Sequence, residues 1–228
     1  MTERSRRRLS LRCSHYTEPA AADCRLWRSL GSSPIRVAVN VSPPKLRRRN
    51  FAREILEGIG DLIGDPVWGV DIEITEGALF GDSSSCVHAL RLMRAAGVRV
   101  AIDDFGTGFS SLGRLSELPI DTLKIDRMFA SRLPGDRKCC KLVTTIIDLA
   151  HAFDMTTVAE GVENQAQRDF LIRAGCDESQ GYLYSRPLPR VELERLLGFS
   201  GSGAVLGGEP RGAAGLSAPT ARVRQSSA

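Results

Sequence analysis

The sequence lacks the patterns that mark membrane, secreted and zinc-binding proteins. It has no apolar run near the ~18 residues that a spanning helix needs, and no apolar segment follows its basic first residues as it does in a secretory signal. Its six cysteines form no Cys-x-x-Cys pair, and no histidine spacing completes a zinc site. We therefore expect no membrane segment in this chain, no zinc centre, and reduced thiols in the cytoplasm.

Aromatic residues are missing beside the basic clusters. Arg6–Arg8 and Arg47–Arg49 are short runs of arginine with no aromatic side chain between them. A nucleic-acid groove usually interleaves the two types, so these runs are interpreted as solvated surface and no nucleic-acid partner is expected. His15, His88 and His151 are scattered, and we expect them to be structural or exposed rather than metal ligands.

The 228 residues suffice for one large domain or two small ones, and 42% of them are hydrophobic, as in ordinary globular proteins. The two ends differ from the middle. From about Ser200 onward the chain is mostly Gly, Ala, Ser and Pro, a composition that buries too little apolar surface to fold. We expect a disordered basic segment at 1–19, a folded body at 20–198 and a disordered tail at 199–228.

The body reads as strands that alternate with helices. Strands are expected at 36–41, 69–76, 98–104, 121–126, 156–161 and 180–184, with the main helices at 50–63, 84–96, 139–152, 165–174 and 190–197. This alternation favours parallel βαβ units. Polar residues recur at the carboxyl end of strand after strand, which is typical of a TIM-type (β/α) barrel. A doubly wound sheet is the alternative, but it gathers such groups near one switch point.

Asp103 and Asp104 are the most informative pair. They end a β-branched apolar run and precede a glycine-rich loop. Adjacent buried carboxylates repel each other unless a cation neutralises them, so the pair indicates a divalent metal site. The alternative is a loop start in which one Asp caps the next helix, and the pair alone does not separate the two.

The polar set as a whole is one Asn, several carboxylates and one Lys. Oxygen ligands suit Mg²⁺ or Mn²⁺, and a carboxylate-rich site at this face suits a two-metal centre for phosphodiester cleavage. Lys124 would steady the nucleophilic water or the phosphate charge. A Schiff-base lysine is the rival interpretation, but it needs no metal and leaves the carboxylates unexplained.

Six motifs in order then resemble the EAL-domain phosphodiesterases, which hydrolyse cyclic di-GMP. The resemblance covers about residues 22–198. Any one motif is weak, but all six in the same order make chance similarity very unlikely. The motifs are Val39–Ser42, Glu73–Glu76, Asp103–Leu112, Leu123–Asp126, Ala159–Glu163 and Gln180–Tyr182.

The resemblance implies a two-metal site for Mg²⁺ or Mn²⁺ that converts cyclic di-GMP to linear pGpG. The implied metal ligands are Asn40, Glu73, Asp103 and Asp104. In the same way, Glu160 is implied as a metal-associated carboxylate and general base, and Lys124 as the lysine that orients water and phosphate. Gln180 supports the site, Asp126 either supports it or caps a strand end, and Glu76 anchors the loop after Asp104. The family links that loop to dimerisation, so we expect pairing of two copies.

The pattern departs from the family at its start. The Glu-Ala-Leu motif is absent, and in the family its Glu is a metal ligand, so one ligand of the site is missing. The match begins at about Asp23–Trp27. In the family, two barrel strands and their helix precede this point. A barrel of this class usually takes about 250 residues, so we expect an incomplete barrel of about six of eight strands, with two exposed edges.

Three hypotheses follow for function. The first is a cyclic-di-GMP phosphodiesterase, impaired by the loss of that Glu. The second is a non-catalytic module that binds cyclic di-GMP or a protein partner. The third is a truncated fragment without function. Turnover that depends on metal separates the first from the others.

Overall fold

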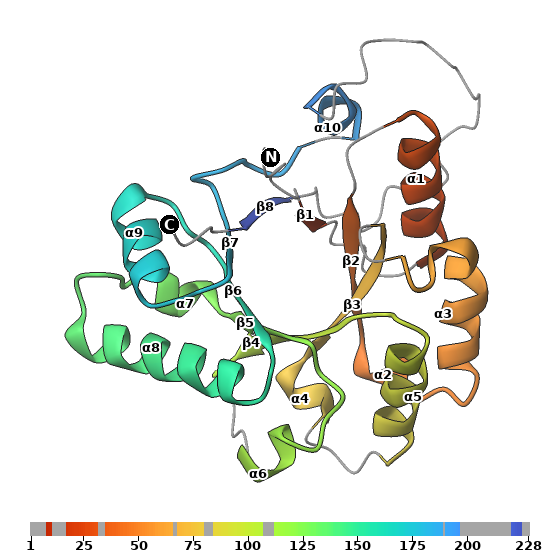
Figure 1. The fold of residues 1–228 in the computed structure, drawn as a ribbon, viewed down its shortest axis with the longest axis horizontal. Coiled ribbons are helices and arrows are strands. Elements are labelled where there is room, and N and C mark those ends of the chain that lie inside the picture. The colour runs from red at the N-terminus through yellow and green to blue at the C-terminus, as the bar shows by residue number, and fades with distance from the viewer. Residues whose placement is uncertain are drawn as a thin grey trace, which may run out of the picture.

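The strands form a ring at the centre of the molecule, and the helices lie around it (Figure 1). This is a computed structural model, in which the described residues are 8–10, 17–31, 35–65, 68–79, 84–106, 112–188, 190–196 and 220–224. Within them, no helix is both long and apolar enough to cross a lipid bilayer.

Six parallel strands form the curled sheet, each hydrogen-bonded to the next in chain order. They confirm the predicted α/β barrel of the TIM type. The strands are β2 (Arg36–Val41), β3 (Gly69–Thr75), β4 (Val100–Phe105), β5 (Thr122–Ile125), β6 (Thr156–Ala159) and β7 (Glu178–Gln180). Their parallel order brings all their carboxyl ends to one end of the ring, which is the end where a barrel of this kind builds its site.

Two short strands from the terminal segments complete the ring. β1 (Arg8–Ser10) pairs parallel with β2, while β8 (Thr220–Arg224) pairs antiparallel with both β1 and β7. These strands, and the start of α1 at Thr17, lie within the segments 1–19 and 199–228 for which the composition predicts disorder. Composition reports how much apolar surface a segment can bury, whereas a strand at a sheet edge is held by main-chain hydrogen bonds. The edges of β2 and β7 are therefore paired within the chain.

Apart from α1, the longer helices occupy the places that the sequence predicted. The longer ones are α1 (Thr17–Ser29), α3 (Phe51–Ile59), α5 (Ser84–Ala95), α8 (Arg137–Ala152), α9 (Gln165–Arg173) and α10 (Arg190–Leu196). Single turns are α2 (Pro43–Leu46), the 3₁₀ turn Gly60–Leu62, α4 (Glu76–Leu79), α6 (Leu112–Leu115) and α7 (Arg127–Ala130). Their starts follow local chemistry. Asp136 accepts from Lys138 N and Cys139 N at the start of α8, and Asn164 with Gln167 forms a capping box at α9.

The last strand corrects the sequence analysis, which placed it at 180–184. β7 ends at Gln180, and a turn follows in which Tyr184 N donates to Gly181 O. A Cβ on Gly181 would lie closer than 3.0 Å to the backbone of Val162. The apolar character of residues 182–184 suggested a strand, but the close approach of two backbones turns the chain away from the sheet.

Polar side chains tie the strands together at their amino ends. Arg36 donates to Asp71 at 2.6 and 2.9 Å, which links β2 to β3 in a buried ion pair. Near β6 and β7, Asp177 accepts hydrogen bonds from Thr157 N and Thr157 Oγ1 at 2.8 Å and lies 2.9 Å from His151 Nε2. These contacts fix the strands at the end opposite the carboxylates, which is the end that usually serves stability in such barrels.

Candidate active site

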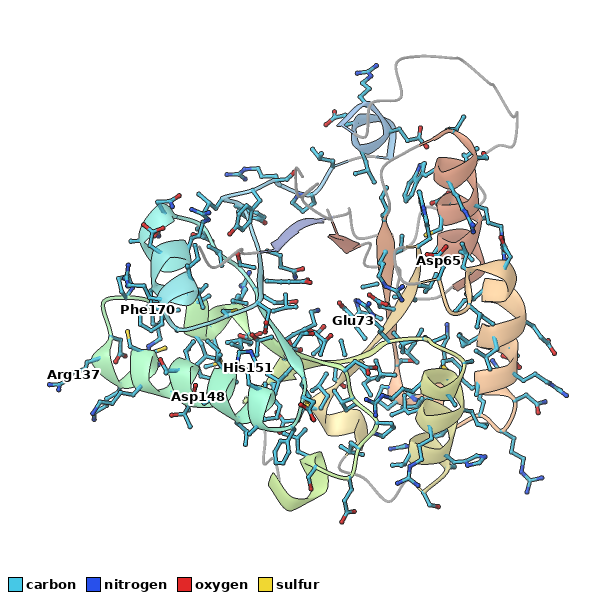
Figure 2. The ribbon with its side chains drawn as sticks, in the orientation of Figure 1. Asp65, Glu73, Arg137, Asp148, His151 and Phe170 are labelled. Carbon is cyan, nitrogen blue, oxygen red and sulfur yellow. The ribbon has the colours of Figure 1, made fainter. Side chains whose placement is uncertain are left out.

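Polar side chains converge where the parallel strands end. Asn40 on β2 pairs in register with Glu73 on β3, so both side chains point to the same side of the sheet. Figure 2 shows Glu73 on the inner side of the ring, whereas Arg137 and Asp148 lie on the outer side of α8. Glu73 is fully buried, and Asn40 is half-buried.

Lys124 on β5 lies at the centre of this group. Its Nζ is 2.7 Å from Glu73 Oε2, 2.7 Å from Asp103 Oδ1 and 2.6 Å from Glu160 Oε1. The lysine has no exposed surface, and the three carboxylates come from β3, β4 and the residue that follows β6. The three carboxylates stabilise the ammonium form, whereas a Schiff base needs the neutral amine. This geometry disfavours the rival interpretation of Lys124.

Asp103, Asp104 and Glu160 form a compact cluster of oxygen ligands. One carboxylate oxygen from each lies within 4.8 Å of the other two. Neighbouring residues on a regular strand point to opposite faces, yet both aspartates reach the cluster. Two irregularities explain this. The pairing of β4 with β5 shifts register between Ile102 and Phe105, and Asp104 has a left-handed backbone with φ of 56°.

The electrostatics of the cluster favour a cation or a proton. Burial raises the pKa of Asp104 to about 6, aided by the charge of Asp103 and by a side-chain hydrogen bond with Asp126. Burial also raises the pKa of Glu160, although the Lys124 ammonium acts in the opposite direction. Hard oxygen ligands with an excess of negative charge suit Mg²⁺ or Mn²⁺. The donor set therefore fits a divalent metal ion.

The loop after β4 is tied back to the barrel by Glu76. Its Oε2 accepts a hydrogen bond from Gly106 N at 3.1 Å, and Glu76 is buried. Gly106 has a left-handed backbone with a φ of 90°, which favours glycine. A Cβ there would also meet the ring of Phe129 at 3.2 Å. Residues 107–111 of this loop lie outside the described residues.

Gln180 at the end of β7 and Asp126 directly after β5 contact the cluster. Gln180 Nε2 donates to Glu160 Oε1 at 2.8 Å. Asp126 accepts from Met128 N at 2.7 Å and caps α7, and it also shares the hydrogen bond with Asp104. A contact of Asp126 therefore supports each of its two interpretations, as a cap and as a supporting residue.

Of the two interpretations of the aspartate pair, the structure argues against the helix cap. The next helix, α6, begins at Leu112, so neither Asp103 nor Asp104 is its N-terminal cap. Sequence reasoning missed Phe129, whose ring lies under Gly106. No signal in the sequence pointed to it, because it is one apolar residue in a short helix after β5.

Comparison with known proteins agrees with this geometry. The family model of the EAL domain matches residues 3–187. This chain belongs to the EAL domain family. The cyclic di-GMP phosphodiesterase NbdA of Pseudomonas aeruginosa is 39% identical over 177 residues, which cover 76% of the chain and 22% of that protein. The chain thus spans about a fifth of the length of this relative.

Solved EAL structures resemble the fold closely. The EAL domain of Mycobacterium smegmatis DcpA has a TM-score of 0.71 and 38% identity, covering 79% of this chain and 81% of that chain. The manganese and cyclic-di-GMP complex of Klebsiella pneumoniae BlrP1 has a TM-score of 0.65 and 28% identity, covering 75% and 43%. The BlrP1 structure thus holds manganese and cyclic di-GMP.

Proposed function

We propose that this EAL domain hydrolyses cyclic di-GMP to linear pGpG with the help of Mg²⁺ or Mn²⁺, and that its activity is impaired. The observation that supports the proposal is the convergence of the buried residues Glu73, Asp103 and Glu160 around Lys124 at the carboxyl ends of the strands, with the half-buried Asp104 beside Asp103 and Glu160. That arrangement suits phosphodiester chemistry, and relatives named as cyclic di-GMP phosphodiesterases share the domain.

The metal would be held by Asp103, Asp104 and Glu160, with Glu73 and Asn40 beside them. When bound, a divalent ion lowers the pKa of a water molecule and stabilises charge on the phosphate oxygens. Glu160 is proposed to accept a proton from the attacking water, because its pKa is raised above the ordinary value for a carboxyl group. Gln180 holds Glu160 in place through its hydrogen bond.

Lys124 is proposed to orient the water and the phosphate. Its ammonium lies 2.6 Å from Glu160, so it is close to the carboxylate that takes the proton. A positive charge at this point also stabilises the negative charge that develops on the phosphate during attack. Glu76 holds Gly106, the first residue after β4, by accepting a hydrogen bond from its backbone N.

The proposed impairment comes from the ligand set. The sequence contains no Glu-Ala-Leu motif, so a two-metal centre built from these residues is one carboxylate short of the set that the resemblance implies. The same observation favours a second candidate function, a module that binds cyclic di-GMP without cleaving it. Both candidate functions require binding of cyclic di-GMP, and only the phosphodiesterase also hydrolyses it.

The deciding experiment is hydrolysis of cyclic di-GMP by the purified chain, followed as pGpG by chromatography with Mg²⁺ or Mn²⁺ present. Glu73→Gln is the control, because it keeps the size of the side chain and removes a buried charge from the cluster. Product from the wild type and not from the control supports the phosphodiesterase. Binding of cyclic di-GMP without product supports the binding module.

Two further proposals concern the surroundings of the domain. We propose that two copies of the domain pair, since the family links the loop after β4 to dimerisation; light scattering of the purified chain tests this pairing as a doubled mass. We also propose a reducing, cytoplasmic location. Its support is that the five cysteines among the described residues are free thiols, namely Cys24, Cys86, Cys139, Cys140 and Cys176.

A further inference from the structure

Lys124 makes an unusual set of contacts for a lysine in a strand. Its side chain has no exposed surface, and its Nζ lies within 2.6–2.7 Å of three carboxylates on three different parts of the ring. An ammonium group has three donors, so each of them can face one carboxylate.

The charges around Lys124 do not balance. Glu73, Asp103, Asp104 and Glu160 are acidic, and Lys124 is the one base among the groups that these contacts bring together. Buried like charges repel strongly because the protein interior screens them weakly. The lysine therefore removes part of the repulsion and leaves an excess of negative charge, which a divalent cation would neutralise.

We propose that Lys124 is an internal counter-ion of the carboxylate cluster, and that it shares with a divalent cation the task of holding the cluster together. The barrel then tolerates a low supply of cation because the lysine ties β3, β4 and the end of β6 to β5. This inference rests on the divalent site of the proposed function, but it does not depend on hydrolysis of any substrate.

The first consequence concerns stability without cation. Lys124→Met keeps the length and the apolar stem of the side chain and removes its charge. Breaking a buried ion pair by removing one partner usually costs several kcal/mol, so in a chelator we expect the melting temperature to fall by about 10 °C. Mn²⁺ should raise the melting temperature of this variant more than that of the wild type, because the metal replaces the missing charge.

The second consequence concerns loss of a carboxylate, which should not lower the melting temperature in chelator as loss of the lysine does. Glu73→Gln removes one of the four carboxylates and still offers an amide oxygen to Lys124. Because the cluster has an excess of negative charge, this variant should melt at or above the wild-type temperature in chelator, although it loses an ion pair. Mn²⁺ should stabilise it less than the wild type, because the cluster then attracts the cation less strongly.

The experiment is thermal unfolding of the purified chain in chelator and in Mn²⁺, for the wild type, Lys124→Met, Glu73→Gln and the double variant. Lys141→Met on α8 is the matched control, since it removes the same charge from an exposed position. The double variant has the same net charge in the cluster as the wild type, and it should be more stable in chelator than Lys124→Met.

The melting temperatures distinguish a counter-ion role of Lys124 from a role in packing alone. If Lys124→Met melts like the wild type and like Lys141→Met in chelator, or if Mn²⁺ stabilises it no more than the wild type, the inference is overturned. If Lys124→Met does not fold, Glu73→Gln decides, because a large loss of stability there also overturns it. A wild type that cleaves no cyclic di-GMP would refute the proposed function and leave these comparisons intact.

Discussion

Gly181 offers a sharp test of how closely two segments approach beside the candidate site. A Cβ at this position would lie closer than 3.0 Å to Val162 N, Val162 O and Val162 C, which are backbone atoms. The two segments are also joined by hydrogen bonds from Val162 N to Gln180 O and from Leu183 N to Val162 O, both at 3.0 Å. Gly181→Ala must therefore separate two paired backbones.

The expected loss of folding stability in Gly181→Ala has two contributions. Overpacking at a rigid site costs roughly 1–3 kcal/mol, and the φ of 154° adds about 1 kcal/mol of strain for a residue with a side chain. The total of about 3 kcal/mol corresponds to a fall in melting temperature of roughly 6–12 °C for a domain of this size. Because Gln180 precedes Gly181 and bonds to Glu160, any hydrolysis of cyclic di-GMP should fall as well.

Gly175 is the matched control, measured by thermal unfolding under the same conditions. It has a φ of 83°, but a Cβ there would meet nothing within 4 Å. Gly175→Ala should therefore lose only the strain contribution, about 1 kcal/mol. Equal falls in melting temperature in the two variants would refute the reasoning, because they would mean that the close approach of Val162 to Gly181 adds nothing to the loss of stability.

Three other predictions test the site and the barrel. Asp103→Asn should abolish any hydrolysis of cyclic di-GMP, because it removes a charge that both the metal and Lys124 need; wild-type turnover measured by chromatography would contradict the metal assignment. Glu76→Ala should reduce turnover by leaving Gly106 N without its acceptor, while Glu57→Ala on the exposed part of α3 should not change it. Asp177 is partly buried, which raises its pKa, but hydrogen bonds from His151 and Thr157 lower it overall. The ionised Asp177 therefore stabilises the fold at neutral pH, and this stabilisation is lost as the pH falls below about 4. The difference in melting temperature between the wild type and Asp177→Asn should shrink below that pH.

Much of the barrel could be predicted from the sequence, because the relevant signals are local. Alternating apolar runs and helical stripes predicted β2 to β6 and the helices between them, within a few residues at each end. The strand at 180–184 was misplaced, since an apolar run does not reveal that Gly181 lies against Val162. The strands β1 and β8 were missed because their pairing depends on partners far away in the sequence.

The sequence by itself determined the residue types of the site. Carboxylates, one Asn and one Lys at successive strand ends indicate an oxygen-ligand metal centre, and the order of six motifs indicates the EAL family. Only the tertiary structure decided how these residues meet. The left-handed backbone of Asp104 and the register shift in β4 bring two adjacent aspartates to one cluster, and the pairing of β3 to β6 places Lys124 among three carboxylates. Those contacts join residues up to 51 positions apart, and no local pattern specifies distances between side chains that only the folded ring brings together.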